Sequence, residues 1–387
     1  MKKILFLFCI AIANFSIAQE LKTTTKLDIK SEKETEYQFK TIVDIEASEV
    51  KSQGRTGTCW SFSASSFFES EIYRETGKFI DISEMFTVRN TYFRKAWIYV
   101  MRQGKAQLSD GGLGHHTMNS IKSFGLVPES EFSGLLGESK THNHKNLTND
   151  IKTVLDAYIK NDKDSNHPNW KVAIDSILTD RIGKNIEEFV YEGKVYTPKS
   201  FLEMTHVNPS DYVTITSFTH VPYYESFILN IPDNFDFGSF YNVPLEELNQ
   251  IATEVLRNGY SIEWDGDVSE KTFSAKNGVA IIPNDKKDTK NSMTHIVKEL
   301  AVTPEFRQQE FENFNTTDDH LMHIIGIEKD QNGNMYYKVK NSWGTNSERI
   351  GNDGYVLMSE SYFKLKSISI MVHKDAIPKE IRAKLGL

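Results

Sequence analysis

The chain has 387 residues, of which 39% are hydrophobic and 12% aromatic, and its formal net charge is −8. A chain of this length and composition can bury a large core, either as one large domain or as two lobes. The negative net charge argues against a nucleic-acid-binding function, which normally requires a basic face.

The N-terminus has the form of a secretory signal peptide over residues 1–18. Lys2 and Lys3 precede the apolar run Ile4–Ala13, and Ser16-Ile17-Ala18 has the form of a cleavage site. The run is too short to span a bilayer, and no later stretch approaches the roughly 20 apolar residues that a transmembrane helix requires. We therefore expect an exported protein, periplasmic or secreted, that does not associate with the membrane after removal of the signal.

Cysteine usage singles out one thiol. Cys9 lies within the apolar run and should leave with the signal peptide, so that Cys59 is the only cysteine of the mature chain. We therefore expect no intramolecular disulfide and a fold that is stabilised by packing.

The remainder of the chain divides by pattern. Residues 19–44 are polar and rich in Lys, Glu and Thr, which predicts an extended or poorly ordered leader. Residues 45–387 are predicted to form one domain, with a helical part at 45–135, a helical insertion at 136–235 and a strand-rich part at 236–387. Helices followed by strands indicate an α+β fold whose two lobes meet at a cleft.

Two helices and one hairpin are the clearest elements. Apolar residues recur at helical spacing through Trp60–Ile72, and Gly77 is a plausible end for this helix. A second amphipathic helix begins at Pro244 and ends at Gly259. Two strands, Met322–Ile327 and Met335–Asn341, flank the turn signal Asp330-Gln331-Asn332-Gly333-Asn334.

The first helix places Cys59 at its N-terminus, directly after a glycine-containing loop. The N–H groups of a helix N-terminus favour a thiolate, which is the useful nucleophile, so we expect a low pKa for this thiol. Gln53, six residues upstream, can fold back so that its amide and the backbone N–H of Cys59 both point at a developing oxyanion. The alternative is a buried cysteine with a purely structural role.

A nucleophilic thiol requires a base, and His320 and His323 lie at the start of an apolar strand. Because they are three positions apart, they should face opposite sides of that strand. Asn341 ends the next strand and can accept the imidazole N–H to orient the ring. Trp343, two residues further on, can shield that bond from water and border the substrate.

Three segments together resemble the signature blocks of papain-like cysteine peptidases. They are the segment around Cys59, the segment Asp319–Ile327 and Asn341-Ser342-Trp343-Gly344, in the same order as in that family. The resemblance implies a two-lobed α+β fold and no cofactor.

The resemblance also implies a role for each matching residue. Gln53 becomes the oxyanion-hole amide, Cys59 the nucleophile and Asn341 the orienting amide. His320 becomes the base rather than His323, because the catalytic histidine of the family lies six residues before a glycine, as His320 does before Gly326.

Two departures from the common pattern point to one branch, the aminopeptidase C and bleomycin hydrolase group. Thr56 and Ser109 occupy places that hold paired cysteines in many secreted members, and His320 lies 261 residues after Cys59, further than the usual spacing. The group is similar in lacking that disulfide and in carrying a long helical insertion. It implies removal of amino-terminal residues from peptides and a homo-oligomer, a hexamer in that group.

In that group the last residues of the chain lie in the cleft, where the terminal carboxylate pairs with the free amino group of the substrate. Here the corresponding segment, residues 375–387, is short, and its pattern predicts one or two helical turns, which shorten its reach. We therefore expect that the Leu387 carboxylate does not reach the nucleophile. An aminopeptidase remains the favoured activity, because the insertion could close the cleft instead.

Other motifs have competing interpretations. Gly111 and Gly112 are either an ordinary turn or a bare backbone along which a substrate strand pairs. The run Trp264-Asp265-Gly266-Asp267 reads as a loop after a strand. Neither His115-His116 nor the pair His142 and His144 has the company of a metal site, so no metal is predicted.

The predicted reaction is acyl transfer, in which the thiolate attacks a peptide carbonyl and water hydrolyses the resulting thioester. Peptides are the expected substrates. An endopeptidase with the same three residues is the nearest alternative, and a non-catalytic peptide-binding protein on the same fold is a remote one. A transglutaminase-like acyl transferase would place an aspartate where Asn341 stands.

Overall fold

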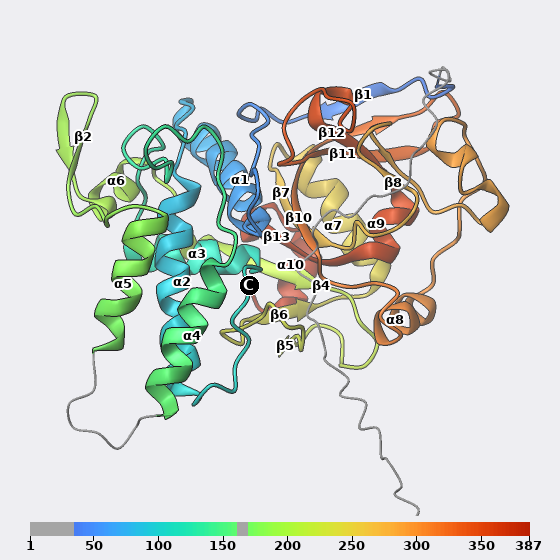
Figure 1. The fold of residues 1–387 in the computed structure, drawn as a ribbon. Coiled ribbons are helices and arrows are strands. Elements are labelled where there is room, and N and C mark those ends of the chain that lie inside the picture. The colour runs from blue at the N-terminus through green and yellow to red at the C-terminus, as the bar shows by residue number, and fades with distance from the viewer. Residues whose placement is uncertain (1–34, 161–168) are drawn as a thin grey trace, which may run out of the picture. The chain divides into compact units, whose positions relative to one another are not determined.

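The computed structural model describes residues 35–160 and 169–387, which belong to one compact unit that extends from Glu34 to Leu387 (Figure 1). The predicted signal peptide, 1–18, lies outside the described residues. In the described part of the chain, no helix combines the length and the apolarity needed to cross a bilayer.

Helices outnumber strands in the first half of the described chain. The helices are α1 (Cys59–Thr76), α2 (Glu84–Met101), α3 (Gly114–Phe124), α4 (Leu147–Lys160), α5 (Trp170–Arg181), α6 (Pro198–Met204), α7 (Leu245–Arg257), α8 (Pro304–Glu312), α9 (Glu360–Lys366) and α10 (Lys379–Leu385). Short 3-10 turns lie at Pro209–Asp211, Lys286–Asp288, Asn291–Met293, Asn352–Gly354 and Lys374–Ala376.

Most strands join one large mixed sheet. The strands are β1 (Lys40–Asp44), β2 (Phe189–Tyr191), β3 (Lys194–Tyr196), β4 (Tyr212–Thr216), β5 (Ser226–Ile228), β6 (Ser239–Asn242), β7 (Ile262–Gly266), β8 (Phe273–Ser274), β9 (Val279–Ala280), β10 (His320–Lys329), β11 (Met335–Lys340), β12 (Tyr355–Ser359) and β13 (Ser367–His373). The sheet runs β5-β6-β4-β13-β7-β10-β11-β12-β9-β8, with β1 against β10, and β2 and β3 form a separate hairpin.

Helix α1 forms as its sequence predicts. Trp60, Phe67 and Phe68 are fully buried, and Gly77 follows the last residue with a φ of 69°, the left-handed conformation that glycine adopts without strain. This helix packs directly on β10 and β7 and also contacts α2 and α3. It therefore joins the helices to the sheet.

Two large core clusters form around the sheet. The first contains Cys59 and apolar residues of α1 to α6, together with Leu321 of β10 and Met371 of β13. The second contains the neighbouring residues Met322 and Ile370 with apolar residues of α7, α9 and α10. Because side chains alternate along a strand, β10 and β13 each contribute to both clusters.

The predicted hairpin is confirmed by the antiparallel pairing of β10 with β11. The Asp330 carboxylate accepts hydrogen bonds from the backbone N–H groups of Asn332 and Asn334, and Gly333 takes a positive φ. These are the interactions for which Asp, Asn and Gly are favoured in turns.

The described end of the 19–44 leader is extended, as β1, and pairs with β10. Two parts of the sequence interpretation are wrong in detail. The stretch 136–235 is not wholly helical, because β4 and β5 lie in it and belong to the main sheet. Residues 264–266 are not a loop, since they complete β7 between β13 and β10.

Candidate active site

The candidate nucleophile, Cys59, is the first residue of α1 and is 9% exposed. The backbone N–H of Leu321, the second residue of β10, acts on its sulfur and lowers the pKa of the thiol, and Leu321 packs in the same core cluster as Cys59. The thiol therefore lies next to the strand on which His320 is the first residue.

His320 and Asn341 are brought together by the β10–β11 hairpin. His320 Nε2 lies 2.8 Å from Asn341 Oδ1, and both residues are 4% exposed. Because the amide oxygen is an acceptor, Nε2 donates, and Nδ1 remains as the ring nitrogen that can accept a proton. The Trp343 ring lies 4.7 Å from the imidazole, centroid to centroid, so that it covers the ring beside this bond, as expected.

The pKa of the thiol differs from the low value expected at a helix N-terminus. Burial raises the pKa of the Cys59 thiol to about 12, the Leu321 N–H acts in the opposite direction, and the charges of Asp318 and Asp233 add to the rise. Burial also lowers the pKa of His320 to about 4. The low thiol pKa predicted from the helix N-terminus is therefore wrong for the resting site, because desolvation outweighs the helix dipole.

Gln53 is tied to the segment that follows β11. Its backbone N–H donates to the Ser342 carbonyl at 2.8 Å, and its Oε1 accepts a hydrogen bond from Ser342 Oγ at 2.6 Å. Nε2 donates to the Thr56 carbonyl at 2.8 Å. An amide nitrogen has two hydrogens, so one donor remains for an oxyanion.

His323, the second candidate base, faces away from this group. It is fully buried, with Nδ1 2.8 Å from Ser66 Oγ of α1 and its ring edge-on to Phe67. The two histidines thus face opposite sides of β10, as their spacing predicts.

Comparison with known proteins agrees with this geometry. Residues 184–386 match the profile of the peptidase C1-like family, and residues 36–213 match that of the papain family of cysteine proteases. The chain belongs to the peptidase C1-like family. The resemblance seen in the sequence is confirmed, and the protein is a cysteine peptidase.

The relatives of this peptidase share low sequence identity with it but align over most of its length. Aminopeptidase C of Listeria monocytogenes serovar 1/2a is 22% identical over 87% of this chain and 83% of its own length. Aminopeptidase G of Lactobacillus delbrueckii subsp. lactis is 24% identical over 70% of this chain and 64% of its own length. The mitochondrial cysteine proteinase 1 of Saccharomyces cerevisiae is 22% identical over 96% of this chain and 83% of its own length.

A solved structure confirms the predicted papain-like α+β fold. PepW from Lactobacillus rhamnosis superposes with a TM-score of 0.70 at 19% identity, covering 90% of this chain and 84% of PepW.

The two glycines near the peptidase nucleophile are explained by packing. A Cβ on Gly111 would lie 1.7 Å from Asp233 Oδ2, and one on Gly112 would lie 3.0 Å from the Trp60 ring. Any larger residue would displace these neighbours. Their predicted contact with substrate stays a prediction.

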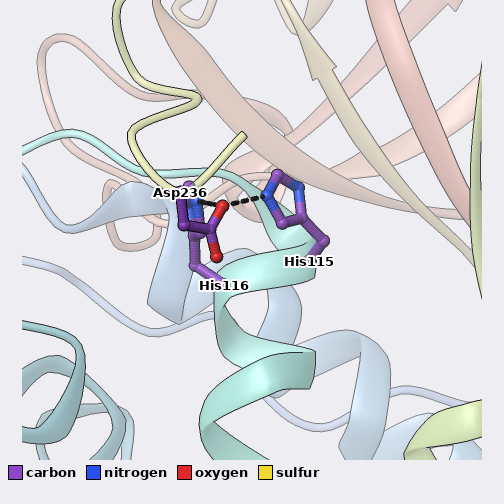
Figure 2. A group of neighbouring side chains, drawn as sticks. All are labelled: His115, His116 and Asp236. Atoms are coloured by element: carbon purple, nitrogen blue, oxygen red, sulfur yellow. Dashed lines mark hydrogen bonds and ion pairs between the residues drawn. The ribbon is translucent and has the colours of Figure 1, made fainter. Parts of the chain in front are cut away.

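One histidine pair has a carboxylate partner that the sequence did not reveal. Figure 2 shows Asp236 between His115 and His116, and its Oδ1 lies 3.0 and 2.9 Å from their Nε2 atoms. The Leu113 N–H donates to His116 Nδ1, so the neutral ring carries its proton on Nε2 and donates to Asp236. That nitrogen has no lone pair for a metal, and hydrogen bonds explain the group without an ion.

The other pair, His142 and His144, is joined by no carboxylate or thiolate that could complete a metal site within the residues described. His144 Nδ1 lies 3.0 Å from Thr56 Oγ1, a residue of the loop that precedes Cys59. This pair supports the loop.

The C-terminal residues lie against the second core cluster. Leu385 of α10 is part of that cluster, and Leu387 packs on it. Lys384 Nζ lies 2.7 Å from Glu247 Oε1 of α7. The expectation that the Leu387 carboxylate does not reach the nucleophile stays a prediction.

A group of acidic residues beside Cys59 was missed by sequence analysis. Glu263 and Asp265 on β7 are each 1% exposed, and Asp318 lies two residues before His320. The signal was present, because two acids at alternate positions of an apolar strand must share one face. The interpretation of Trp264-Asp265-Gly266-Asp267 as a loop concealed this alternation, because Asp265 lies in that run.

Proposed function

We propose that this peptidase is an aminopeptidase that uses Cys59, His320 and Asn341 as a catalytic triad. The observation that carries the proposal is the 2.8 Å bond between His320 Nε2 and Asn341 Oδ1, because the residue after His320 packs in the same core cluster as Cys59. A neutral thiol and a neutral imidazole are a competent starting pair, because the proton can move between them as the sulfur attacks.

In the proposed reaction, Cys59 Sγ forms a bond to the carbonyl carbon of the first peptide bond while its proton moves to His320 Nδ1. The free hydrogen of Gln53 Nε2 and the Cys59 N–H stabilise the oxyanion. The imidazolium then protonates the leaving amine, which departs as the shortened peptide. Water attacks the thioester, gives its proton to His320, and releases the amino acid and the thiol.

The names of two relatives, aminopeptidase C and aminopeptidase G, support cleavage at the amino terminus. An endopeptidase would use the same chemistry, so the distinction depends on recognition of the free amino group.

The test uses alanyl and N-acetyl-alanyl coumarin amides with wild type and Cys59→Ala. Wild type should release coumarin from the free-amine substrate, and Cys59→Ala should release none above background while keeping the thermal unfolding temperature of the wild type. Residual activity above a few per cent would exclude Cys59 as the nucleophile. End-group analysis of a digested peptide and its acetylated twin separates the two activities, and equal cleavage at internal bonds would establish the endopeptidase.

We also propose that the protein is exported after cleavage behind Ala18. Determination of the N-terminus of the protein recovered from outside the cytoplasm tests this, and a mature chain that retains residues 1–18 would contradict it. Sedimentation of the mature protein tests the homo-oligomer that the resembling group implies.

A further inference from the structure

Four carboxyl groups lie on or near the face of the sheet that packs against the helix of the nucleophile, since Asp265 is directly opposite Leu321, which shares a core cluster with Cys59. Glu263 and Asp265 project from β7, Asp318 precedes β10, and Asp233 precedes β6. The charges of Asp318 and Asp233 both act on the Cys59 thiol, and the charge of Asp318 also acts on Glu263. We call Asp233, Glu263, Asp265 and Asp318 the acidic pocket.

Several oxygens of the acidic pocket are buried without a partner. Glu263 Oε1, Asp265 Oδ1 and Asp318 Oδ2 have no hydrogen bond within the described structure. Asp265 and Asp318 can satisfy each other by sharing one proton, which requires that one of them be protonated. Glu263 Oε1 is left without a partner even then, and because an unsatisfied buried oxygen is costly, it indicates a group that binds there.

No described cation fills this role. Lys95 is the lysine whose charge interacts with Asp233 and Asp318, but its Nζ donates to the carbonyl oxygens of Ser109 and Gly111. It forms no ion pair with either aspartate among the described residues. Among the described residues, no cation therefore forms an ion pair with the acidic pocket.

The Glu263 carboxyl packs directly against Gly114, the first residue of α3. A Cβ at position 114 would lie 2.3 Å from Glu263 Oε2. Any other residue here would therefore displace the carboxyl.

We propose that the acidic pocket binds the free α-ammonium group of the peptide substrate, with Glu263 and Asp318 as its main partners. An ammonium has three N–H donors, so it can satisfy Glu263 Oε1 and also bind the carboxyl oxygens of Asp318 and Asp265. The inference rests on the proposed aminopeptidase function and names the structural basis of its specificity.

Substrate geometry favours the α-ammonium over a charged side chain. In the residue under attack, the amino nitrogen and the carbonyl carbon are only two bonds apart, about 2.5 Å. Carboxylates that bind this nitrogen must therefore lie close to the attacking sulfur, as Asp318 and Asp233 do. The ammonium would also offset the negative charges that oppose thiolate formation at Cys59.

The test compares Glu263→Gln and Asp318→Asn with wild type and with Glu299→Gln, a buried glutamate that accepts a hydrogen bond from Ser359 instead. Three coumarin amides serve as probes: alanyl, N-acetyl-alanyl and N-acetyl-arginyl-alanyl. We expect each pocket variant to lose at least about tenfold in kcat/KM on the alanyl amide, mainly through KM, and Glu299→Gln to lose less than about twofold. The acetylated alanyl amide should change little.

Two results would overturn the inference. Pocket variants that keep wild-type kcat/KM on the alanyl amide would show that the ammonium binds elsewhere. A loss confined to the arginyl substrate would assign the pocket to a side-chain cation. In both cases the aminopeptidase function itself would stand, since it is judged by end-group analysis of the digested peptide and its acetylated twin.

If the variants do not fold, inhibition of the wild-type enzyme by two small amides tests the inference without them. Alaninamide should inhibit hydrolysis of the alanyl amide at a concentration at least about tenfold lower than N-acetylalaninamide does. Equal inhibition by the two amides would refute the inference.

Discussion

At the scale of single residues, the two histidines of β10 show how three positions in a strand separate chemistry from packing. His320 bonds to Asn341 beside the nucleophile, whereas His323 is enclosed between β10 and α1. Burial is the main cause of the lowered pKa of His323, and the charge of the nearby Lys340 lowers that pKa further. A permanently neutral His323 is suited to a structural role.

We predict opposite consequences for the two alanine variants. His320→Ala should lower kcat by about 10²- to 10⁴-fold with little change in stability, because it removes the base. His323→Ala should lower the free energy of unfolding by about 2–4 kcal/mol, because it leaves a cavity in the core, and should keep most of the activity of the folded fraction. Steady-state kinetics and urea unfolding measure both, and the reverse ranking would reassign the base to His323.

At the scale of elements, the segment before the catalytic helix belongs to the fold. Tyr37 is 7% exposed, and its hydroxyl donates to the carbonyl oxygens of Ser292 and His295 at 2.8 and 3.0 Å. Its ring stacks on Phe39, which lies against Tyr336. These contacts hold β1 beside β10, the strand that carries the candidate base.

Tyr37→Ala should therefore lower the free energy of unfolding by about 3 kcal/mol, as expected for loss of a buried aromatic ring. Tyr37→Phe is the matched control, and it should cost about 1 kcal/mol because only the hydroxyl bonds are lost. Urea unfolding followed by tryptophan fluorescence gives both values. An unchanged midpoint for Tyr37→Ala would mean that β1 contributes nothing to the fold.

At the scale of the whole molecule, the acidic pocket links stability to pH. Burial and the charge of Asp318 raise the pKa of Glu263 from 4.5 to about 8. Between these two values the folded protein binds one more proton than the unfolded chain. The resulting stabilisation is complete below pH 4.5 and is lost as the pH rises towards 8.

The unfolding free energy of Glu263→Gln relative to wild type should therefore rise between pH 5 and 8, by on the order of 3 kcal/mol. Glutamine cannot ionise, so it avoids the cost that wild type meets as the pH increases. Titration of His320, whose pKa is about 4 in the folded protein, affects both proteins equally and cancels. Parallel pH profiles would show that Glu263 is already ionised in the folded protein at neutral pH.

The sequence alone determined the features that depend on local periodicity and on turn-forming residues. Helical spacing after Cys59, the Asp330–Asn334 turn and the opposite faces of His320 and His323 follow from backbone periodicity and turn chemistry, which act over a few neighbouring residues. These features also carried the family resemblance.

Only the tertiary structure decided which charges meet and in which state. The neutral Cys59 and His320, the bond from Gln53 to Ser342 and the pocket of Glu263 and Asp318 depend on burial and on partners far apart in the chain. Desolvation acts on a group only once the surrounding elements have packed. A pattern of local spacing therefore identifies the candidate residues, but it cannot give their protonation.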